Sequence, residues 1–269
     1  MNSRNRLAAA SALAVFWMIC LGFIRPVLKL PDIAALDRVA AGDSQVPIRD
    51  LSGDLIYIYH SPTYGEQTKI TLDEAADELI ALTIITEDNR FFSNPGFSPA
   101  AILRAVIQNL ILRRTFSGAS TITQQVVRNI LLSPEERFDR SIGRKTKEIL
   151  LAALVTLRYD KETILTIYLN EMYYGRNATG VEKAAEIYFG KHASELDLSE
   201  AAFIAGLPQA PNYYGNDEEA GQNRQREVLW LLERAIRENN CIQISGGKDP
   251  KTCCPSREEI RQSFPVPTE

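Results

Sequence analysis

The sequence contains little of what several common enzyme classes need. It has two histidines and four cysteines among 269 residues. Neither histidine belongs to a recognisable pattern with serine or cysteine, which argues against a catalytic triad, and no P-loop or H-E-x-x-H motif occurs. A structural zinc site needs four ligands at suitable spacing, but His60 and His192 lie far in sequence from the three late cysteines. The formal net charge of −4 gives no sign of a general nucleic-acid binder.

A long apolar segment occupies the N-terminal region. Residues 7–24 contain no charged side chain, and this length of 18 residues just spans the hydrocarbon core of a bilayer. We expect an uncleaved transmembrane anchor. Arg4 and Arg6 favour an N-terminus inside the cell, although Arg25 and Lys29 flank the other end. A cleaved signal peptide is the alternative, but it would have a shorter apolar run and a small-residue cleavage site. The anchor would leave most of the chain outside the cytoplasm.

The late cysteines fit an oxidising compartment. Cys241, Cys253 and Cys254 lie in a polar segment, whereas Cys20 lies in the apolar run. One disulfide from Cys241 to either Cys253 or Cys254 is compatible with that compartment. One of the three late cysteines would then remain unpaired, so the choice between Cys253 and Cys254 stays open.

The predicted fold is mainly α with a minor β element. Residues 46–60 predict a short β-hairpin, because strand-forming residues flank the turn residues Ser52, Gly53 and Asp54. Apolar spacing predicts helices over residues 72–91, 97–112, 143–159, 160–175, 197–208 and 223–239. The resulting division is 1–30 as cytoplasmic tip and anchor, 31–71 as linker and hairpin, 72–235 as the helical domain, and 236–269 as a cysteine-bearing polar tail.

Local signals set the ends of several helices. Pro99 suits a first helical position, and Asp160 suits an N-cap. Gly175 is expected to stop the helix that Asp160 begins. Asp197 and Glu200 have the spacing of a capping box.

Two glutamates continue apolar helix faces. Glu87 follows Ile84, Thr83 and Ile80 at helical spacing. An apolar setting raises the pKa of a carboxyl group, which suits it to accept a proton near neutral pH. A frayed helix end that exposes Glu87 to water is the alternative.

Glu148 shows the same pattern from the other side. Its face continues through Leu151 and Val155, and Arg144 and Lys145 precede it on the same face. Surface ion pairs would explain these cations. A cationic cluster near a helix N-terminus would also bind an anion, and phosphate or pyrophosphate fits it well. Two carboxylates are common tools for chemistry at a sugar anomeric carbon.

A polar run separates two amphipathic segments. The stretch "SGASTITQQ", residues 117–125, crowds hydroxyl and amide side chains together. A loop followed by a helix cap is one interpretation, and a polar wall for a polar substrate is the other. Residues 99–128 also carry four arginines and no acidic residue. A solvated helix face or an anionic or membrane partner would explain that excess.

These segments, taken in order, resemble the family-51 peptidoglycan glycosyltransferases, which include the transglycosylase domains of class A penicillin-binding proteins and their monofunctional relatives. The matching motifs are "EDNRFFSNPG" (87–96), "GASTITQQ" (118–125), "RKTKE" (144–148), "ILTIYLNEMYYG" (164–175), "GVEKAAEIYFGK" (180–191) and "EAAFIAGLPQAP" (200–211). The resemblance covers about residues 47–235. It implies a lysozyme-like helical head and a hydrophobic, membrane-proximal jaw at about 97–140.

The resemblance also implies roles for individual residues. Glu87 matches the catalytic base, which takes the proton of the 4-hydroxyl of the acceptor sugar of lipid II. That oxygen attacks the anomeric carbon of the growing chain with inversion, and undecaprenyl pyrophosphate leaves. Glu148 matches the second catalytic glutamate, on the pyrophosphate side. The residues implied to bind substrate are Asp88, Phe91, Asn94, Gly118, Ser120, Thr121, Thr123, Gln124, Gln125, Arg128, Arg144, Lys145 and Asn170.

The implied cofactors, partners and location follow from the same family. No cofactor is firm, although a divalent cation, Mg²⁺ or Mn²⁺, is allowed at the pyrophosphate. The partners are lipid II, the growing glycan chain, the membrane and other cell-wall synthesis proteins. The expected location is the bacterial inner membrane, as a single-pass protein with its catalytic domain on the periplasmic or extracellular side.

The sequence departs from the family pattern at two positions. Asn94 stands where the first motif usually has histidine, and Arg128 stands where the second often has lysine. Arg128 keeps the charge but not the geometry. No serine acyl-transferase domain follows residue 235, so we expect no peptide cross-linking. A glycan hydrolase on the same scaffold and a non-catalytic module of a wall-building complex are the rival hypotheses.

Overall fold

The computed structural model of the chain describes residues 29–61, 69–100, 102, 120–238, 242–244 and 251–253. The predicted anchor, residues 101 and 103–119 of the predicted jaw (with Gly118 among them), Cys241 and Cys254 lie outside these residues. Within the described part of the chain, no helix combines the length and the apolar character that crossing a bilayer requires.

The described residues are mainly helical, as predicted. The α-helices are α2 (Ala35–Ala40), α3 (Asp77–Glu87), α5 (Ile122–Val126), α6 (Pro134–Phe138), α7 (Ile142–Arg158), α8 (Lys161–Glu171), α9 (Val181–Phe189), α10 (Leu198–Gly206), α11 (Pro211–Asn216) and α12 (Glu218–Arg237). Single turns of 3₁₀ helix cover Leu72–Glu74, Ala193–Glu195 and Leu207–Gln209, and Val127–Leu131 forms a π-helix.

The predicted hairpin is present near the start of the described chain. Strands β1 (Gln45–Arg49) and β2 (Leu55–His60) pair in antiparallel fashion, with Val46 opposite Tyr59. At the turn, a carboxylate oxygen of Asp50 accepts hydrogen bonds from the backbone amides of Ser52 and Asp54, at 3.0 Å each. Ser52, Gly53 and Asp54 therefore lie in the turn between the two strands, as predicted.

Several helix ends follow the predicted capping signals. The Asp160 side chain accepts a hydrogen bond from the amide of Thr163 at the start of α8. Asp197 and Glu200 form the expected capping box at the start of α10. Pro99 is helical, and the amide of Ile102 donates to the carbonyl of Ser98.

Other boundaries were predicted wrongly. The single helix expected over 72–91 is divided, because Ala75 and Ala76 are extended between the 3₁₀ turn and α3. Gly175 does not stop α8, which ends at Glu171. Gly175 instead has a φ of 85° in the following turn, where a Cβ atom would lie 2.4 Å from the carbonyl oxygen of Pro211. Helix α12 also begins earlier than expected, with Asp217 as its cap.

The tail contains a small element that the sequence did not indicate. Strand β3 (Ile242–Ile244) pairs in antiparallel fashion with β4 (Lys251–Cys253), with Ile242 opposite Cys253. The predicted disulfide cannot be followed here, since both of its pairings need Cys241, which lies outside the described residues.

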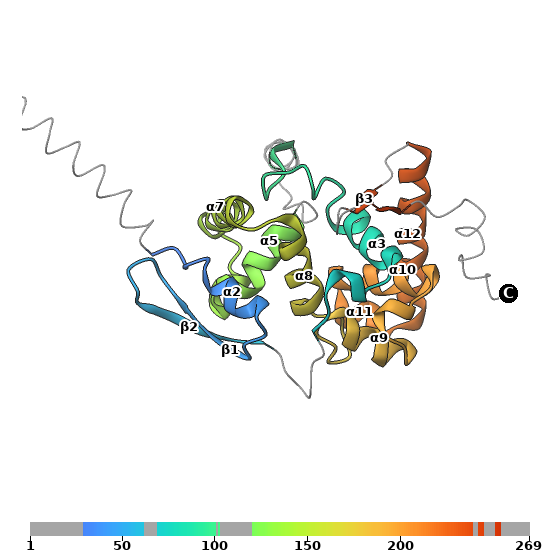
Figure 1. The fold of residues 1–269 in the computed structure, drawn as a ribbon, viewed down its shortest axis with the longest axis horizontal. Coiled ribbons are helices and arrows are strands. Elements are labelled where there is room, and N and C mark those ends of the chain that lie inside the picture. Colours follow the sequence, from blue (N-terminus) through green and yellow to red (C-terminus); the bar gives the residue numbers. More distant parts are fainter. Residues whose placement is uncertain are drawn as a thin grey trace, which may run out of the picture.

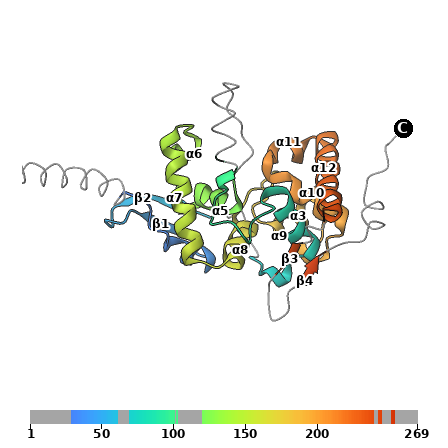
Figure 2. The same ribbon diagram turned by 90° about the horizontal axis from the view of Figure 1, so that it is seen from above.

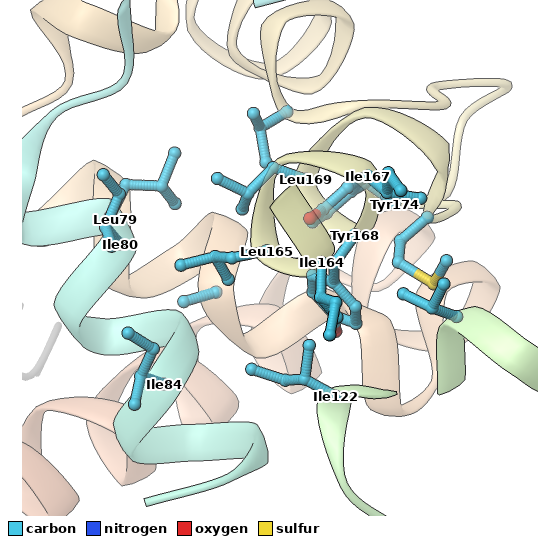
Figure 3. Close-up of a cluster of buried hydrophobic side chains, with 14 of the residues drawn as sticks. Leu79, Ile80, Ile84, Ile122, Ile164, Leu165, Ile167, Tyr168, Leu169 and Tyr174 are labelled. Carbon is cyan, nitrogen blue, oxygen red and sulfur yellow. The ribbon is translucent and has the colours of Figure 1, made fainter. Parts of the chain in front are cut away.

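The helices form two groups that share one core. Helices α5, α7 and α8 lie on the side of the β1–β2 hairpin, whereas α3, α10 and α12 lie together on the other side (Figures 1 and 2). Figure 3 shows Leu79, Ile80 and Ile84 of α3 facing α8, from which Leu165 points toward them. Ile122 of α5 closes the cluster beside Ile164, and all these side chains are buried. This apolar contact fixes the end of α3 relative to α5.

A buried carboxylate attaches the hairpin to the helical domain. Glu171, at the end of α8, is 4% exposed. Its Oε2 accepts hydrogen bonds from the Tyr59 hydroxyl at 2.7 Å and the Ser61 hydroxyl at 3.0 Å. Its Oε1 lies 2.6 Å from Nζ of Lys69. Removing one member of such a pair leaves a poorly solvated charge and unpaired hydroxyls.

We therefore expect Glu171→Leu to lower the free energy of unfolding by about 3 kcal/mol. Urea-induced unfolding followed by circular dichroism would measure this loss. Glu186→Leu is a suitable control, because Glu186 is exposed and forms a surface ion pair with Lys183, whose loss should change stability by less than about 0.5 kcal/mol. If both variants lose the same small amount, apolar packing alone holds the hairpin.

Candidate active site

Glu87 is the last residue of α3, and its carboxylate meets α5. The stripe that leads to it, Ile80, Thr83 and Ile84, is buried as predicted. Gln125 Nε2 donates to Glu87 Oε2 at 2.6 Å. Burial raises the pKa of Glu87, while the Gln125 hydrogen bond opposes that shift. A carboxyl group with a raised pKa at a helix end is suited to proton transfer.

Nearby charges also act on Glu87. The positive charges of Arg224 and Arg128 lower the pKa of Glu87, and the negative charge of Asp88 raises it. These effects are smaller than that of burial. The pKa of Glu87 is therefore set by two opposing influences, burial, which raises it, and the two cations, which lower it.

The polar run contributes the start of α5. The hydroxyl oxygen of Thr121 accepts from the amide of Gln124 at 3.2 Å, and Gln124 Oε1 accepts from the amide of Thr121 at 3.0 Å. The Thr121 hydroxyl also donates to the carbonyl of Gly96 at 2.6 Å. Part of the run is thus a capping box, and the cap interpretation holds for Thr121 and Gln124.

Glu148 is the fully buried centre of a second cluster, on α7. Its Oε2 contacts Nη1 of Arg144 and its Oε1 contacts Nζ of Lys145. Lys145 Nζ also donates to the Ser120 hydroxyl at 3.0 Å. Burial lowers the pKa of Lys145, although Glu148 opposes this shift. The predicted ion pairs exist, but they surround a carboxylate with 0% exposure and are not surface pairs.

One hydrogen-bond donor in this cluster has no acceptor among the described residues. Nε of Arg144 is buried and has no hydrogen-bond partner within the described residues. A buried donor without a partner costs about 1–3 kcal/mol. An anion bound beside the guanidinium would supply the missing acceptor.

The segment Ser120–Gln125 joins the two carboxylate clusters. Ser120 accepts from Lys145 in the Glu148 cluster, and Gln125 donates to Glu87. Arg128 follows in the π-helix Val127–Leu131, and its charge lowers the pKa of both Glu87 and Lys145. Single π-turns are frequent at functional sites because they redirect side chains. The two clusters therefore flank one short polar segment.

Asp88 and Asn94 form a network next to Glu87. Nδ2 of Asn94 donates to both carboxylate oxygens of Asp88, at 2.9 and 2.8 Å. Oδ1 of Asn94 accepts from the amide of Gly96 at 2.9 Å and from Nζ of Lys161 at 3.2 Å. Burial raises the pKa of Asp88, and the Asn94 hydrogen bonds oppose this.

The structure does not bring every predicted substrate-binding residue to an open site. Phe91 is fully buried in the core, and Thr123 is fully buried with a hydroxyl that has no partner within the described residues. Asn170 bonds the backbone of Ile70 through both its amide atoms and also reaches the carbonyl of Thr166. The direct contacts to substrate that the resemblance implies for these residues remain predictions.

Sequence reasoning missed four residues around Glu87. The hydroxyls of Tyr168 and Tyr174 are fully buried without a partner in the described part of the chain, and burial and then the charge of Glu87 raise the pKa of both. Arg224 is 7% exposed, and its Nε donates to the carbonyl of Gly206 at 3.2 Å. Lys161 is connected to the network next to Glu87 by its hydrogen bond to Asn94. For Arg224 a signal existed, since it interrupts a buried face of α12 just as Glu87 interrupts one of α3.

The described residues contain no group of three or more histidine, cysteine, aspartate or glutamate side chains arranged to hold a metal ion. Both carboxylate oxygens of Glu148 already contact cationic side chains. Glu148 does not fit as a ligand of a divalent cation in this arrangement.

Comparisons with known proteins agree on one family. The family model described as "Transglycosylase" matches residues 54–233. Penicillin-binding protein 1A of Escherichia coli is 39% identical over 222 residues, which cover 82% of this chain and 23% of the relative. Penicillin-binding protein 1A of Aquifex aeolicus is 38% identical over 215 residues, which cover 78% of this chain and 28% of the relative.

The matching chains are much longer than this one. The chain spans less than a third of the length of these two curated relatives. A crystal structure of penicillin-binding protein 1A from Haemophilus influenzae matches with a TM-score of 0.38 and 20% identity, covering 81% of this chain and 20% of that chain. That likeness is too distant to add to the sequence match. Because the family model covers more than half of the residues, this chain belongs to the transglycosylase family.

Proposed function

We propose that the chain is a peptidoglycan glycosyltransferase that polymerises lipid II into linear glycan strands. Family membership supports the reaction class. The observation that carries the proposal within the structure is the pair of carboxylates in different surroundings at the two ends of Ser120–Gln125. Glu87 has a raised pKa, whereas Glu148 is enclosed by cations. Environments that separate two carboxyl groups in this way divide acid–base work from charge stabilisation.

In the proposed reaction, Glu87 acts as the base. It takes the proton of the acceptor 4-hydroxyl as that oxygen forms a bond with the anomeric carbon of the donor. The bond from the anomeric carbon to the pyrophosphate oxygen breaks, its electron pair leaves with undecaprenyl pyrophosphate, and the carbon is inverted. The Gln125 hydrogen bond holds the Glu87 carboxylate in place before the proton is transferred.

The Glu148 cluster is proposed to hold the leaving group. Arg144 and Lys145 stand in the first turn of α7, where free amides and the helix dipole add to their positive charge. Glu148 contacts both partly buried cations, and Nε of Arg144, which lacks a hydrogen-bond partner among the described residues, is available to an anion. We assign no step to a divalent cation, because the carboxylate that would bind it is occupied by these cations.

A membrane location is part of the same proposal. The chain would be a single-pass protein of the bacterial inner membrane, anchored by residues 7–24, with its catalytic domain on the periplasmic side. Phe138 and Ile142 expose 84% and 86% of their surface, and the exposed Arg140 lies between them in the sequence. Large exposed apolar side chains next to cations suit contact with an anionic lipid surface. The jaw proposed at about 97–140 would carry part of this contact.

The base is tested by Glu87→Gln, which keeps an oxygen to accept the Gln125 hydrogen bond but cannot take a proton. We expect the rate of polymerisation to fall by about 100-fold or more. The measurement is the gel pattern of glycan chains formed from labelled lipid II by detergent-solubilised protein. Glu78→Gln, in the first turn of the same helix, is the matched control and should polymerise normally.

The same gel separates the rival functions. Glycan strands that become shorter would identify a hydrolase. If wild-type protein bound lipid II but made no polymer across metals and detergents, the chain would be a non-catalytic module.

The pH dependence of polymerisation tests the Gln125 hydrogen bond. A hydrogen bond to the charged carboxylate lowers the pKa of Glu87, so Gln125→Met should raise that pKa. A base works only when deprotonated, and the acidic limb of kcat/KM should therefore move to higher pH. Gln222→Met, which removes a surface hydrogen bond to Glu218, should leave the limb in place. An acidic limb that does not move in Gln125→Met would show that Gln125 does not set the ionisation of Glu87.

A further inference from the structure

Lys161 lies at the end of a hydrogen-bonded chain that leads to the catalytic segment. Its Nζ donates to the backbone carbonyl of Asn94 at 2.9 Å and to Oδ1 of Asn94 at 3.2 Å. The amide nitrogen of Asn94 then donates to both oxygens of Asp88. Asp88 directly follows Glu87 in the sequence. A cation on α8 is thus connected to the residue next to the proposed base.

The same chain reaches the start of α5. Oδ2 of Asp88 accepts a hydrogen bond from the amide of Ile122 at 3.3 Å. The amide of Gly96 donates to Asn94, and the carbonyl of Gly96 accepts from the Thr121 hydroxyl. The loop 88–96 is therefore attached at two points to the helix that carries Gln125, the partner of Glu87.

Gly96 presses this loop against α7. Its φ is 90°, and a Cβ atom there would lie 2.3 Å from the carbonyl oxygen of Ala152. Ala152 lies four residues after Glu148 on the same helix. The loop that Lys161 contacts is consequently packed against both the helix that carries Glu148 and the start of the helix that carries Gln125.

The position of Lys161 is unfavourable for a lysine without a partner. It is the first residue of α8, where the helix dipole disfavours a cation. Burial lowers its pKa to about 8, and the charge of Asp88 only partly compensates. Its ammonium group lies 4.7 Å from the centre of the Phe91 ring. Contacts with Asn94 and Phe91, together with the nearby charge of Asp88, give this half-buried cation its local stabilisation.

We propose that Lys161 is a positioning residue of the transferase, which acts through Asn94 and Asp88 to fix Glu87 against α5. The proposal rests on the proposed function, since it concerns the base of that reaction. Lys161 and Asn94 touch no substrate in this role. Their effect is the geometry of the loop 88–96.

The role explains how asparagine serves where related motifs have histidine. Asn94 uses the donor end of its amide on the anion Asp88 and the acceptor end on the cation Lys161. The amide provides both functions without titrating, whereas a protonated imidazole would have only donors and would repel the ammonium group. Asn94 is therefore a neutral connector between two opposite charges.

Lys161→Met tests the proposal, because methionine keeps an apolar stem over Phe91 and removes only the ammonium group. We expect kcat for glycan polymerisation to fall by about 10- to 100-fold, as for a small displacement of a catalytic group, with KM for lipid II little changed. Lys161→Arg should recover part of the loss. Lys191→Met is the matched control, since Lys191 is another half-exposed lysine that pairs with a glutamate, Glu200, and it should retain wild-type kcat.

A charge exchange tests the connection itself. Asn94→Asp would place two carboxylates in contact and should reduce kcat at least as much as Lys161→Met. Adding Asp88→Asn in the same chain restores one amide and one carboxylate, with the amide now at position 88 and the carboxylate at position 94. This double variant should then recover activity relative to Asn94→Asp alone. Recovery of this kind would not follow from a general loss of stability.

The outcomes separate this inference from the proposed function. If wild-type protein forms no glycan polymer, the proposed function fails. If wild-type protein polymerises and Lys161→Met does so at an equal kcat, the positioning role fails. If Lys161→Met unfolds, the exchange decides: recovery in the double variant supports the role, and a double variant no more active than Asn94→Asp overturns it.

Discussion

The arrangement of the site depends on the short segment that begins α5. Ser120 at one end accepts a hydrogen bond from Lys145, and Gln125 at the other end donates one to Glu87. Two carboxylates from distant parts of the sequence are thereby held at the two ends of six residues. The capping box of Thr121 and Gln124 gives this segment a defined start, so the hydrogen bonds that stabilise the helix also set the spacing of the clusters.

Apolar packing makes this spacing rigid. Glu87 ends a helix whose buried face, Leu79, Ile80 and Ile84, faces α8 across the core, and Ile122 of α5 lies in the same cluster (Figure 3). Close-packed interiors tolerate little displacement. A change in the contact between α3 and α8 would therefore move the carboxylate of Glu87 relative to Gln125. The fold and the position of the proposed base are determined by the same side chains.

The sequence was sufficient to find features that local chemistry determines. The apolar stripes behind Glu87 and Glu148, the caps at Asp160 and Asp197, and the hairpin turn all follow from neighbours within a few residues. Contacts between distant segments were not accessible in this way. Nothing near Lys161 indicates that it meets Asn94, 67 residues away, and no local pattern marked the π-helix or the β3–β4 pair. The polar run shows the limit clearly, because its residue types fit both a cap and a substrate wall. The structure assigns Thr121 and Gln124 to the cap, and it leaves Ser120 and Gln125 in contact with the charged groups.

The two glutamates then differ because their surroundings differ. Burial raises the pKa of Glu87, whereas Glu148 has Arg144 and Lys145 in direct contact. A carboxylate whose two oxygens both contact cations holds those cations in place through charge-assisted hydrogen bonds. It is well suited to orient the cations toward another anion. Among the described residues, Glu87 has no such direct cation, and its neutral donor there, Gln125, leaves the carboxylate able to change its charge. The proposed difference in role between the two residues therefore follows from which neighbours each one has, and those neighbours are brought together by the core between α3, α5 and α8.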